Sequence, residues 1–272
     1  MQNLNQYKTK IREKLPNEIA ASLLELENLE LPDEQKIAVF DLDNTLINGD
    51  IGESVFCYLK SIGHEFDLKW KEYLELIDKK EYQNAYSNII TTMKGLSVKV
   101  VSNAARRLIT SNSDSIYFSE DGIEYSYPIP KEIPDITHLI VYLKISGWKI
   151  AVISASSHIS VRAVCETLFK LNPEYVRGVR TEIDVTDNYD DLYTDIIRGE
   201  LSYGAGKVNV FHEMFGNDAK PLITAGDSLG DIDLMNLSSP NGFAIIRGAS
   251  SAHRQHLKSK LRSDIKTIEY AL

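Results

Sequence analysis

The sequence predicts an α/β fold, with an open, Rossmann-like parallel sheet as its core and a small helical insert after the first strand. Three observations support this prediction: short apolar runs typical of buried strands, helical patterns between those runs, and one long segment with helical spacing and no strand pattern. Strands that alternate with helices usually form a parallel sheet with right-handed crossovers.

Four short apolar runs supply the strands of the predicted sheet. They are rich in β-branched residues, as strands buried on both faces tend to be. The runs lie at residues 37–40, 149–154, 221–225 and 242–246. Helical patterns at residues 135–146 and 208–215 precede the second and third runs, and a longer helical pattern at residues 7–30 is broken or begun at Pro16.

The predicted insert has four sets of apolar residues at helical spacing, between residues 51 and 110. We therefore expect a helical cap at residues 49–110. The core is expected to comprise residues 1–48, which include an N-terminal helical extension, and residues 111–272. The insert is rich in aromatic residues, most of which should form its own core, although one or two could form a cage for a quaternary ammonium.

Two antiparallel strand pairs are also expected. In the first, at residues 115–127, Asp121-Gly122 is a favoured two-residue turn. That turn sets a register with Ile116 opposite Tyr127 and Phe118 opposite Tyr125. A second pair is expected within residues 176–203, around 179–183 and 194–201.

Composition excludes several classes of function. The chain has 272 residues, of which 43% are hydrophobic and 25% charged, as in an ordinary globular protein. A net charge of −9 argues against broad binding to a nucleic-acid backbone. The two cysteines, Cys57 and Cys165, suggest no disulfide framework. No signal peptide or membrane-length apolar run is apparent, so we expect a cytoplasmic protein.

Four polar clusters lie where predicted strands end or a predicted helix begins. Ligands of open α/β sheets bind beyond the carboxyl ends of the strands, so these distant residues should meet in space. The clusters are Asp41-Leu42-Asp43-Asn44-Thr45 after the first run, Ser154 at the end of the second, Lys207 at a helix start, and Gly226-Asp227-Ser228-Leu229-Gly230-Asp231 after the third.

Several carboxylates at one edge of a sheet repel one another unless a cation offsets their charge. Mg²⁺ is a hard cation that takes oxygen ligands. Asp41 and Asp227 are the natural ligands, together with a backbone carbonyl near Asp43. Ser154 and Lys207 could then hold an anion beside the metal, which predicts a phosphate site. Taken singly, each of these residues could also be an ordinary helix cap or a solvated helix start.

The segments FDLDNTL, VISAS, GAGK and TAGDSLGD resemble, in that order, the four motifs of phosphatases of the haloacid dehalogenase (HAD) superfamily. The resemblance runs from about residue 36 to residue 247, with the insert matched only in type. It implies that Asp41 is the nucleophile, forming an aspartyl-phosphate. It also implies that Asp43 is the general acid to the leaving group and then the general base to water.

The same resemblance implies roles for the other motif residues. Thr45 would steady the geometry of the two aspartates, and Ser154 and Lys207 would hold phosphoryl oxygens. Asp227 would bind magnesium directly, and Asp231 would support it from the second shell of ligands.

The insert matches in position the first type of cap in this family, which closes over the site and selects the substrate. Asp50 lies nine residues after Asp41. In the phosphoserine phosphatase branch, which this chain resembles, an acidic residue at about this offset contacts the substrate's amino group. A solvated start of a cap helix is the simpler interpretation of Asp50. Arg106-Arg107 could reach a substrate carboxylate, but an ion-paired surface is favoured.

The function expected from these observations is a Mg²⁺-dependent phosphomonoesterase that acts on a small phosphorylated metabolite. An amine-bearing substrate, similar to phosphoserine, phosphocholine or phosphoethanolamine, is favoured over a sugar phosphate. The alternatives are a phosphotransferase with the same intermediate and a non-catalytic binding module. A dehalogenase would need neither Asp43 nor a full metal set. No nucleic-acid or membrane partner is expected.

Overall fold

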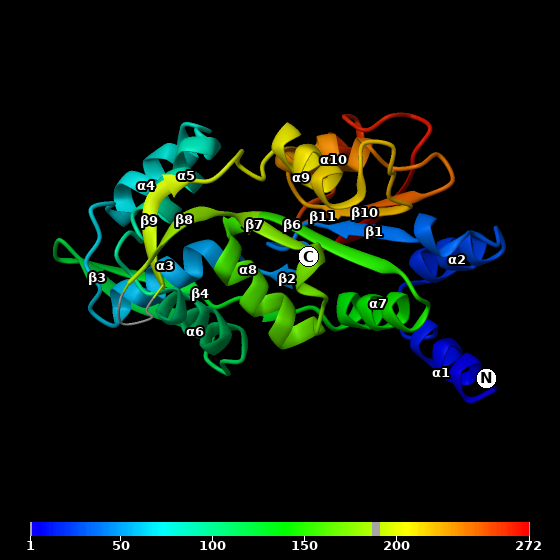
Figure 1. Ribbon diagram of the computed structural model, residues 1–272, viewed down its shortest axis with the longest axis horizontal. Helices are drawn as coiled ribbons and strands as arrows, with labels where there is room; N and C mark the ends of the chain where they lie inside the picture. Colours follow the sequence, from blue (N-terminus) through cyan, green and yellow to red (C-terminus); the bar gives the residue numbers. More distant parts are fainter. Residues whose placement is uncertain (1, 187–190, 272) are drawn as a thin grey trace.

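A six-stranded sheet forms the centre of the computed structural model of this chain, which describes residues 2–186 and 191–271 (Figure 1). All neighbouring strands pair in parallel, in the order β12-β11-β10-β1-β6-β7. The strands are β1 (Ile37–Phe40), β6 (Lys149–Ser157), β7 (Val176–Val179), β10 (Ile223–Gly226), β11 (Phe243–Gly248) and β12 (Lys266–Ala271). The predicted parallel α/β core is therefore confirmed, and the sheet gains β7 and β12.

Helices cover both faces of the sheet, which explains why its central strands are apolar throughout. In Figure 1, α7 and α8 lie below the sheet and α9 and α10 lie above it. All four residues of β1 are buried. The core helices are α1 (Gln2–Arg12), α2 (Asn17–Glu27), α7 (Pro134–Ile145), α8 (His158–Val164), α9 (Ala205–Phe215), α10 (Ile232–Asn236) and α11 (Ser251–Lys258). Short helical turns are η1 (Asp33–Gln35), η2 (Cys165–Phe169), η3 (Pro173–Tyr175) and η4 (Leu229–Asp231).

Four helices occupy the segment between residues 51 and 110, as its apolar spacing predicted. They are α3 (Ile51–Ser61), α4 (Trp70–Asp78), α5 (Tyr82–Thr91) and α6 (Val98–Ile109). Helix α3 begins where the carboxylate of Asp50 accepts a hydrogen bond from the backbone N–H of Glu53 at 2.8 Å, a standard N-cap arrangement. Its buried Phe56 packs against Trp70 of α4, with ring centroids 6.1 Å apart. The domain boundaries at residues 49 and 110 stay a prediction.

The hairpin at residues 115–128 has the predicted register. It consists of β3 (Ser115–Glu120) and β4 (Ile123–Pro128), with Ile116 opposite Tyr127 and Phe118 opposite Tyr125. Its inward face packs on α3 and α4, where Trp70 meets the rings of Phe118 and Tyr127 edge-on. The hairpin therefore extends the helical insert, although it follows it in the sequence. Close to the same junction, β2 (Ile47–Asn48) pairs with β5 (Lys131–Glu132).

The second antiparallel pair is shifted from its predicted position. It consists of β8 (Thr181–Val185) and β9 (Asp191–Ile197), while residues 176–179 form β7 of the main sheet. The prediction was wrong about residue 179, because β7 is a short, mostly buried strand of the main sheet, whereas four of the five residues of β8 are exposed. Residues 187–190, also within the predicted stretch, lie outside the described residues.

Hairpin β8–β9 joins the core to the helical insert through main-chain contacts. The N–H of Gly95 donates to the carbonyl of Tyr193 at 2.8 Å, and the N–H of Tyr193 donates to the carbonyl of Leu96 at 2.9 Å. The hydroxyl of Tyr193 lies 2.7 Å from that of Ser157, at the end of β6. The insert is thus held by its two chain connections, by its packing on α8 and β6, and by this later segment.

Cys57 and Cys165 are buried free thiols. Among the residues that the structure describes, no helix is both long and apolar enough to cross a membrane.

Candidate active site

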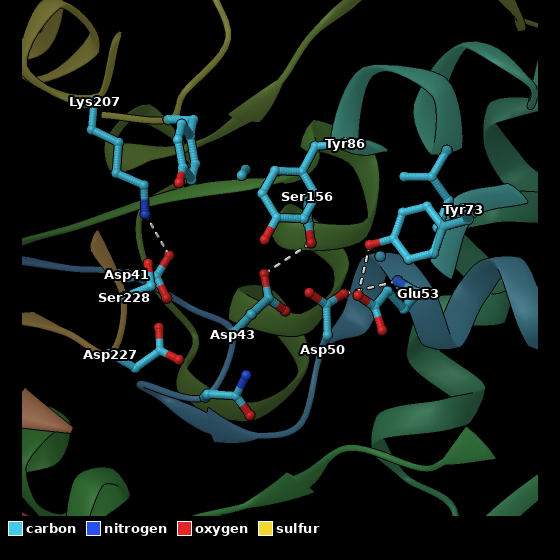
Figure 2. A pocket seen from close by; sticks show the side chains of 15 residues that line it. Asp41, Asp43, Asp50, Glu53, Tyr73, Tyr86, Ser156, Lys207, Asp227 and Ser228 are labelled. Atoms are coloured by element: carbon cyan, nitrogen blue, oxygen red, sulfur yellow. Dashed lines mark hydrogen bonds and ion pairs between the residues drawn. The ribbon is translucent and has the colours of Figure 1, made fainter. Parts of the chain in front are cut away.

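The carboxyl ends of the central strands bring distant motif residues together (Figure 2). Asp41 directly follows β1, and its N–H continues the strand pairing by donating to the carbonyl of Ala225 at 3.0 Å. Lys207, in the first turn of α9, donates to one carboxylate oxygen of Asp41 and to one of Asp231, each at 2.6 Å. These three side chains are almost fully buried. The expected meeting of β1, α9 and the turn after β10 is therefore observed.

A tight turn after β1 aims Asp43 into the same cavity. The carbonyl of Leu42 accepts N–H groups from Thr45, Leu46 and Ile47, which closes the turn. Asn44 takes a positive φ of 53° there, a conformation that asparagine tolerates better than most residues. The turn therefore fixes the direction of both aspartates.

Asp43 is held by three hydrogen-bond donors. The hydroxyls of Ser154 and Ser156 donate to one of its oxygens at 2.7 and 2.8 Å, and the N–H of Ile51 donates to the other at 2.7 Å. Burial raises the pKa of Asp43, and these hydrogen bonds oppose the shift. An oriented carboxyl group with a raised pKa is suited to carrying a proton near neutral pH.

Ser154 does not reach the cavity wall. Its hydroxyl is fully buried, donates to Asp43 and accepts from the N–H of Ser156 at 2.9 Å. Ser156 lines the cavity instead. Ser156 was not among the predicted site residues, although residues two apart on an extended strand share one face, as Ser154 and Ser156 do. As the structure stands, a phosphoryl contact by Ser154 remains a prediction, and its observed contact is with Asp43.

Thr45 is buried, and its hydroxyl has no hydrogen-bond partner among the described residues. No side-chain hydrogen bond of Thr45 therefore supports its expected role in steadying Asp41 and Asp43. The backbone N–H of Thr45 contributes to the turn through the carbonyl of Leu42.

Three carboxylates form the group best suited to a metal ion. Single oxygen atoms of Asp41, Asp227 and Asp231 all lie within 4.8 Å of one another. Burial raises the pKa of Asp41 to about 7, Lys207 opposes the shift, and Asp231 and Asp43 add to it. Burial followed by the charges of Asp231 and Asp41 raises the pKa of Asp227 well above its usual range. In this cluster three buried carboxylates face a single cation, Lys207.

The donor set fits a hard divalent cation such as Mg²⁺. Carboxylate oxygens are the ligands such ions take, and an added cation would offset the repulsion. Asp231 is already saturated: one oxygen accepts from Lys207, and the other accepts the hydroxyl of Ser228 at 2.8 Å and two backbone N–H groups. The carboxylate of Asp227 has no such partner among the described residues, so Asp227 is better placed than Asp231 to bind a metal directly.

One cavity of about 80 Å³ connects this cluster with the helical insert. In Figure 2, Lys207, Asp41 and Asp227 lie at one end and Asp50, Glu53 and Tyr73 at the other, with Asp43, Ser156 and Tyr86 between them. Asp50 therefore does line the cavity, in addition to capping α3. Arg106 and Arg107 do not line it: Arg106 pairs with Glu166 at 2.5 Å and Arg107 lies over the ring of Tyr58.

The insert end of the cavity holds two buried carboxylates. Glu53 accepts a hydrogen bond from the hydroxyl of Tyr73 at 2.6 Å and another from the hydroxyl of Tyr127. Burial raises the pKa of Asp50 well above its usual range, and Asp43 and Glu53 add to this shift. Burial also raises the pKa of Glu53, while the two tyrosine hydroxyls oppose the shift. A cation would stabilise Asp50 and Glu53, as it would stabilise the carboxylates of Asp41, Asp227 and Asp231.

Tyr73 and Tyr86, two aromatic residues of the insert, line the cavity, as the expectation of an aromatic cage allowed, whereas Tyr203 was not foreseen. Tyr203 comes from the segment before α9, and its ring centroid lies 5.7 Å from that of Tyr86 and 6.3 Å from that of Tyr82. Tyr127 reaches Glu53 from β4. The aromatic content of the insert was a signal for part of this wall, but the contacts of Tyr127 and Tyr203 depend on tertiary packing.

Solved structures with a similar fold cover most of this chain. A protein of unknown function from Bordetella pertussis Tohama I is 16% identical, with 85% of this chain and 97% of that chain covered and a TM-score of 0.62. One of unknown function from Anaerococcus prevotii DSM 20548 is 18% identical, with 87% and 86% covered and a TM-score of 0.61. A phosphoserine phosphatase solved as a phospho-aspartyl intermediate analogue is 21% identical, with 87% and 94% covered and a TM-score of 0.52.

These likenesses support the fold alone, since their sequence identities are low. A search of curated proteins finds no match. The sequence model of the haloacid dehalogenase-like hydrolases matches residues 38–236, which include the turn after β1 and the turn after β10. The chain therefore belongs to the haloacid dehalogenase-like hydrolase family.

Proposed function

We propose that this protein is a Mg²⁺-dependent phosphomonoesterase that hydrolyses a small phosphorylated metabolite through a phosphorylated Asp41. One observation carries the proposal: a buried carboxylate paired with Lys207 opens on the same cavity as Asp43, a second carboxyl group held by three donors. Nucleophile and proton carrier are thus both oriented before the substrate binds.

In the first half-reaction, a carboxylate oxygen of Asp41 attacks phosphorus, and the bond from phosphorus to the leaving oxygen breaks. Asp43 donates its proton to that oxygen, so the alcohol leaves uncharged. In the second half-reaction, water attacks the phosphoryl group on Asp41. Asp43 takes the proton of the water, phosphate is released and the Asp41 carboxylate is restored.

Lys207 supplies fixed positive charge beside the nucleophile. Burial lowers the pKa of Lys207, but the charges of Asp231 and Asp41 raise it more, so the net shift is upward. The side chain therefore remains a cation that can hold a phosphoryl oxygen during the transfer. Asp231 holds Lys207 from the opposite side and also organises the turn after β10.

Asp41, Asp227 and the backbone carbonyl of Asp43 would hold the metal, with Asp231 behind them. When bound, Mg²⁺ would neutralise charge on the phosphoryl oxygens and on the carboxylates around them. The metal contact through the carbonyl of Asp43 and the supporting role of Asp231 are inferred from the family resemblance and from the observed carboxylate cluster.

For the substrate, we propose an amine-bearing phosphate ester, with Asp50 near its amino group. The buried acidic end of the cavity supports this choice over a sugar phosphate. If an alcohol instead of water accepted the phosphoryl group from Asp41, the protein would be a phosphotransferase. If the site bound phosphate esters without turning them over, the protein would be a binding module.

The test is release of inorganic phosphate from a panel of about a hundred phosphorylated metabolites, with Mg²⁺ and with excess chelator. Mg²⁺ should activate, chelation should abolish turnover, and Ca²⁺ should bind but support little catalysis because its coordination is looser. Full activity in excess chelator would contradict the metal site. Repeating the active reactions with an added alcohol separates transfer from hydrolysis.

A further inference from the structure

The two ends of the cavity differ in the charge available to a ligand. Among the described residues that line the cavity, Lys207 is the one basic side chain, and it is already bound to Asp41 and Asp231. Asp50 and Glu53 lie at the other end with no basic side chain beside them. A leaving group that enters this end therefore meets negative charge and no counterion.

The hydrogen bonds of these two acids leave capacity for a ligand. One carboxylate oxygen of Asp50 accepts the N–H of Glu53, and its other oxygen has no hydrogen-bond partner among the described residues. Both oxygens of Glu53 accept tyrosine hydroxyls, which orient the group without neutralising it. A ligand ammonium could donate to the free oxygen of Asp50 while Glu53 contributes its charge at close range.

Aromatic side chains line this end and the passage that leads to it. Tyr73 lies at this end and Tyr86 between the two ends, whereas Tyr203 packs against Gly230 at the core end. Aromatic faces attract cations, and the attraction grows when water is excluded. The hydroxyls of Tyr73 and Tyr127 are directed at Glu53, so neither is free to receive a ligand carboxylate.

The size of the cavity limits the leaving group. A volume of about 80 Å³ is well below the roughly 300–1,000 Å³ of pockets that take drug-sized ligands. A phosphoryl group at Asp41 and Lys207 takes up part of it. What remains suits a chain of a few atoms that ends in a cation, and not a sugar or a nucleoside.

From these observations we infer that the leaving group is a small aminoalcohol that carries an ammonium group and no carboxylate. The inference rests on the proposed phosphatase function and narrows its substrate class. Phosphoserine also carries an ammonium, but its carboxylate would lie in the same acidic end, against Asp50 and Glu53, with no basic side chain to receive it. Ethanolamine phosphate differs from phosphoserine only by that carboxylate.

The first experiment compares these two esters on the wild-type protein with Mg²⁺. Like charges a few ångströms apart in a partly buried site repel strongly, so we expect kcat/KM to be about 100-fold higher for ethanolamine phosphate. Choline phosphate tests whether the aromatic walls suffice without N–H donors. A kcat/KM for phosphoserine equal to or above that for ethanolamine phosphate would overturn the inference.

The second experiment changes the charge of the acidic end. Glu53→Gln keeps the shape of the side chain and should lower kcat/KM for ethanolamine phosphate by about 10-fold or more. The ratio of kcat/KM for ethanolamine phosphate to kcat/KM for phosphoserine should therefore become smaller. Glu124→Gln is the matched control, because Glu124 is an exposed residue of β4 outside the cavity. An unchanged substrate ratio in a folded Glu53→Gln protein contradicts a role in selection.

A binding measurement separates failure of the inference from failure of the proposed function. The Asp41→Asn variant is titrated with both esters by calorimetry. Turnover without preference for the carboxylate-free ester contradicts the inference and leaves the phosphatase function standing. Selective binding of ethanolamine phosphate, with no phosphate release by the wild type from any ester, contradicts the phosphatase function and supports the cation site. Neither turnover nor selective binding contradicts both.

Discussion

The two ends of the cavity are both acidic, but among the described residues that line it only the core end has a basic side chain. At the core end, Lys207 bridges Asp41 and Asp231, and rigid strand ends position each group. At the insert end, Asp50 and Glu53 are held by a helix N-terminus and by tyrosine hydroxyls. Under the proposed function, the core end holds and transfers the phosphoryl group, whereas the insert end holds the leaving group.

The largest expected effect comes from removing the nucleophile at the core end. Asp41→Asn should reduce turnover of every phosphate ester to near background, because the amide cannot form the covalent intermediate. The wild type, quenched rapidly during turnover, should carry phosphate on Asp41, as peptide mass spectrometry would show. Labelled phosphate on a histidine or a serine would mean that the mechanism is wrong.

The next effect comes from the proton carrier at the same end. Asp43→Asn keeps the nucleophile but removes the group that protonates the leaving oxygen and activates water, so turnover should fall by roughly 10²–10⁴-fold. The loss should be smaller for p-nitrophenyl phosphate, whose leaving group needs less protonation. Single-turnover kinetics on both esters measures this difference, and identical losses would argue against proton transfer by Asp43.

Substitution at the insert end should give a smaller effect that depends on the substrate. Asp50→Ala should lower kcat/KM for amine-bearing phosphates by about 10- to 100-fold, the worth of a charge-assisted hydrogen bond in a partly dry site. The loss on p-nitrophenyl phosphate should be much smaller. Equal losses on both substrates would mean that Asp50 shapes α3 and does not select the substrate.

The smallest effect is expected at Ser156, between the two ends. Ser156→Ala removes one of the three donors to Asp43 and leaves those from Ser154 and Ile51, so kcat should fall by about 10-fold or less. The loss should be uniform across amine-bearing and neutral leaving groups, since Ser156 acts on the proton carrier. Steady-state kinetics on the same two esters distinguishes this pattern from that of Asp50→Ala.

The core end was more predictable from the sequence than the insert end. Strand β1 is a continuous buried run, and the residue after such a strand lies at the carboxyl edge of the sheet, so the place of Asp41 follows from local pattern. The contact between Ser154 and Asp43 was not foreseen, because it depends on the path of the turn after β1. The hydrogen bond from Tyr127 to Glu53 joins residues 74 positions apart, and no spacing rule reveals it.

Hairpin β8–β9 has a consequence for protein engineering. In enzymes whose substrate-selecting segment is attached only at its two chain ends, that segment can be exchanged between relatives as a cassette. Here the segment also forms main-chain hydrogen bonds with Tyr193, which lies about a hundred residues later in the sequence. A chimaera that replaced residues 49–110 alone would leave the N–H and carbonyl of Tyr193 without their present partners. A transfer of specificity in this scaffold should therefore move residues 49–110 together with both hairpins, because Tyr127 of β4 also binds Glu53.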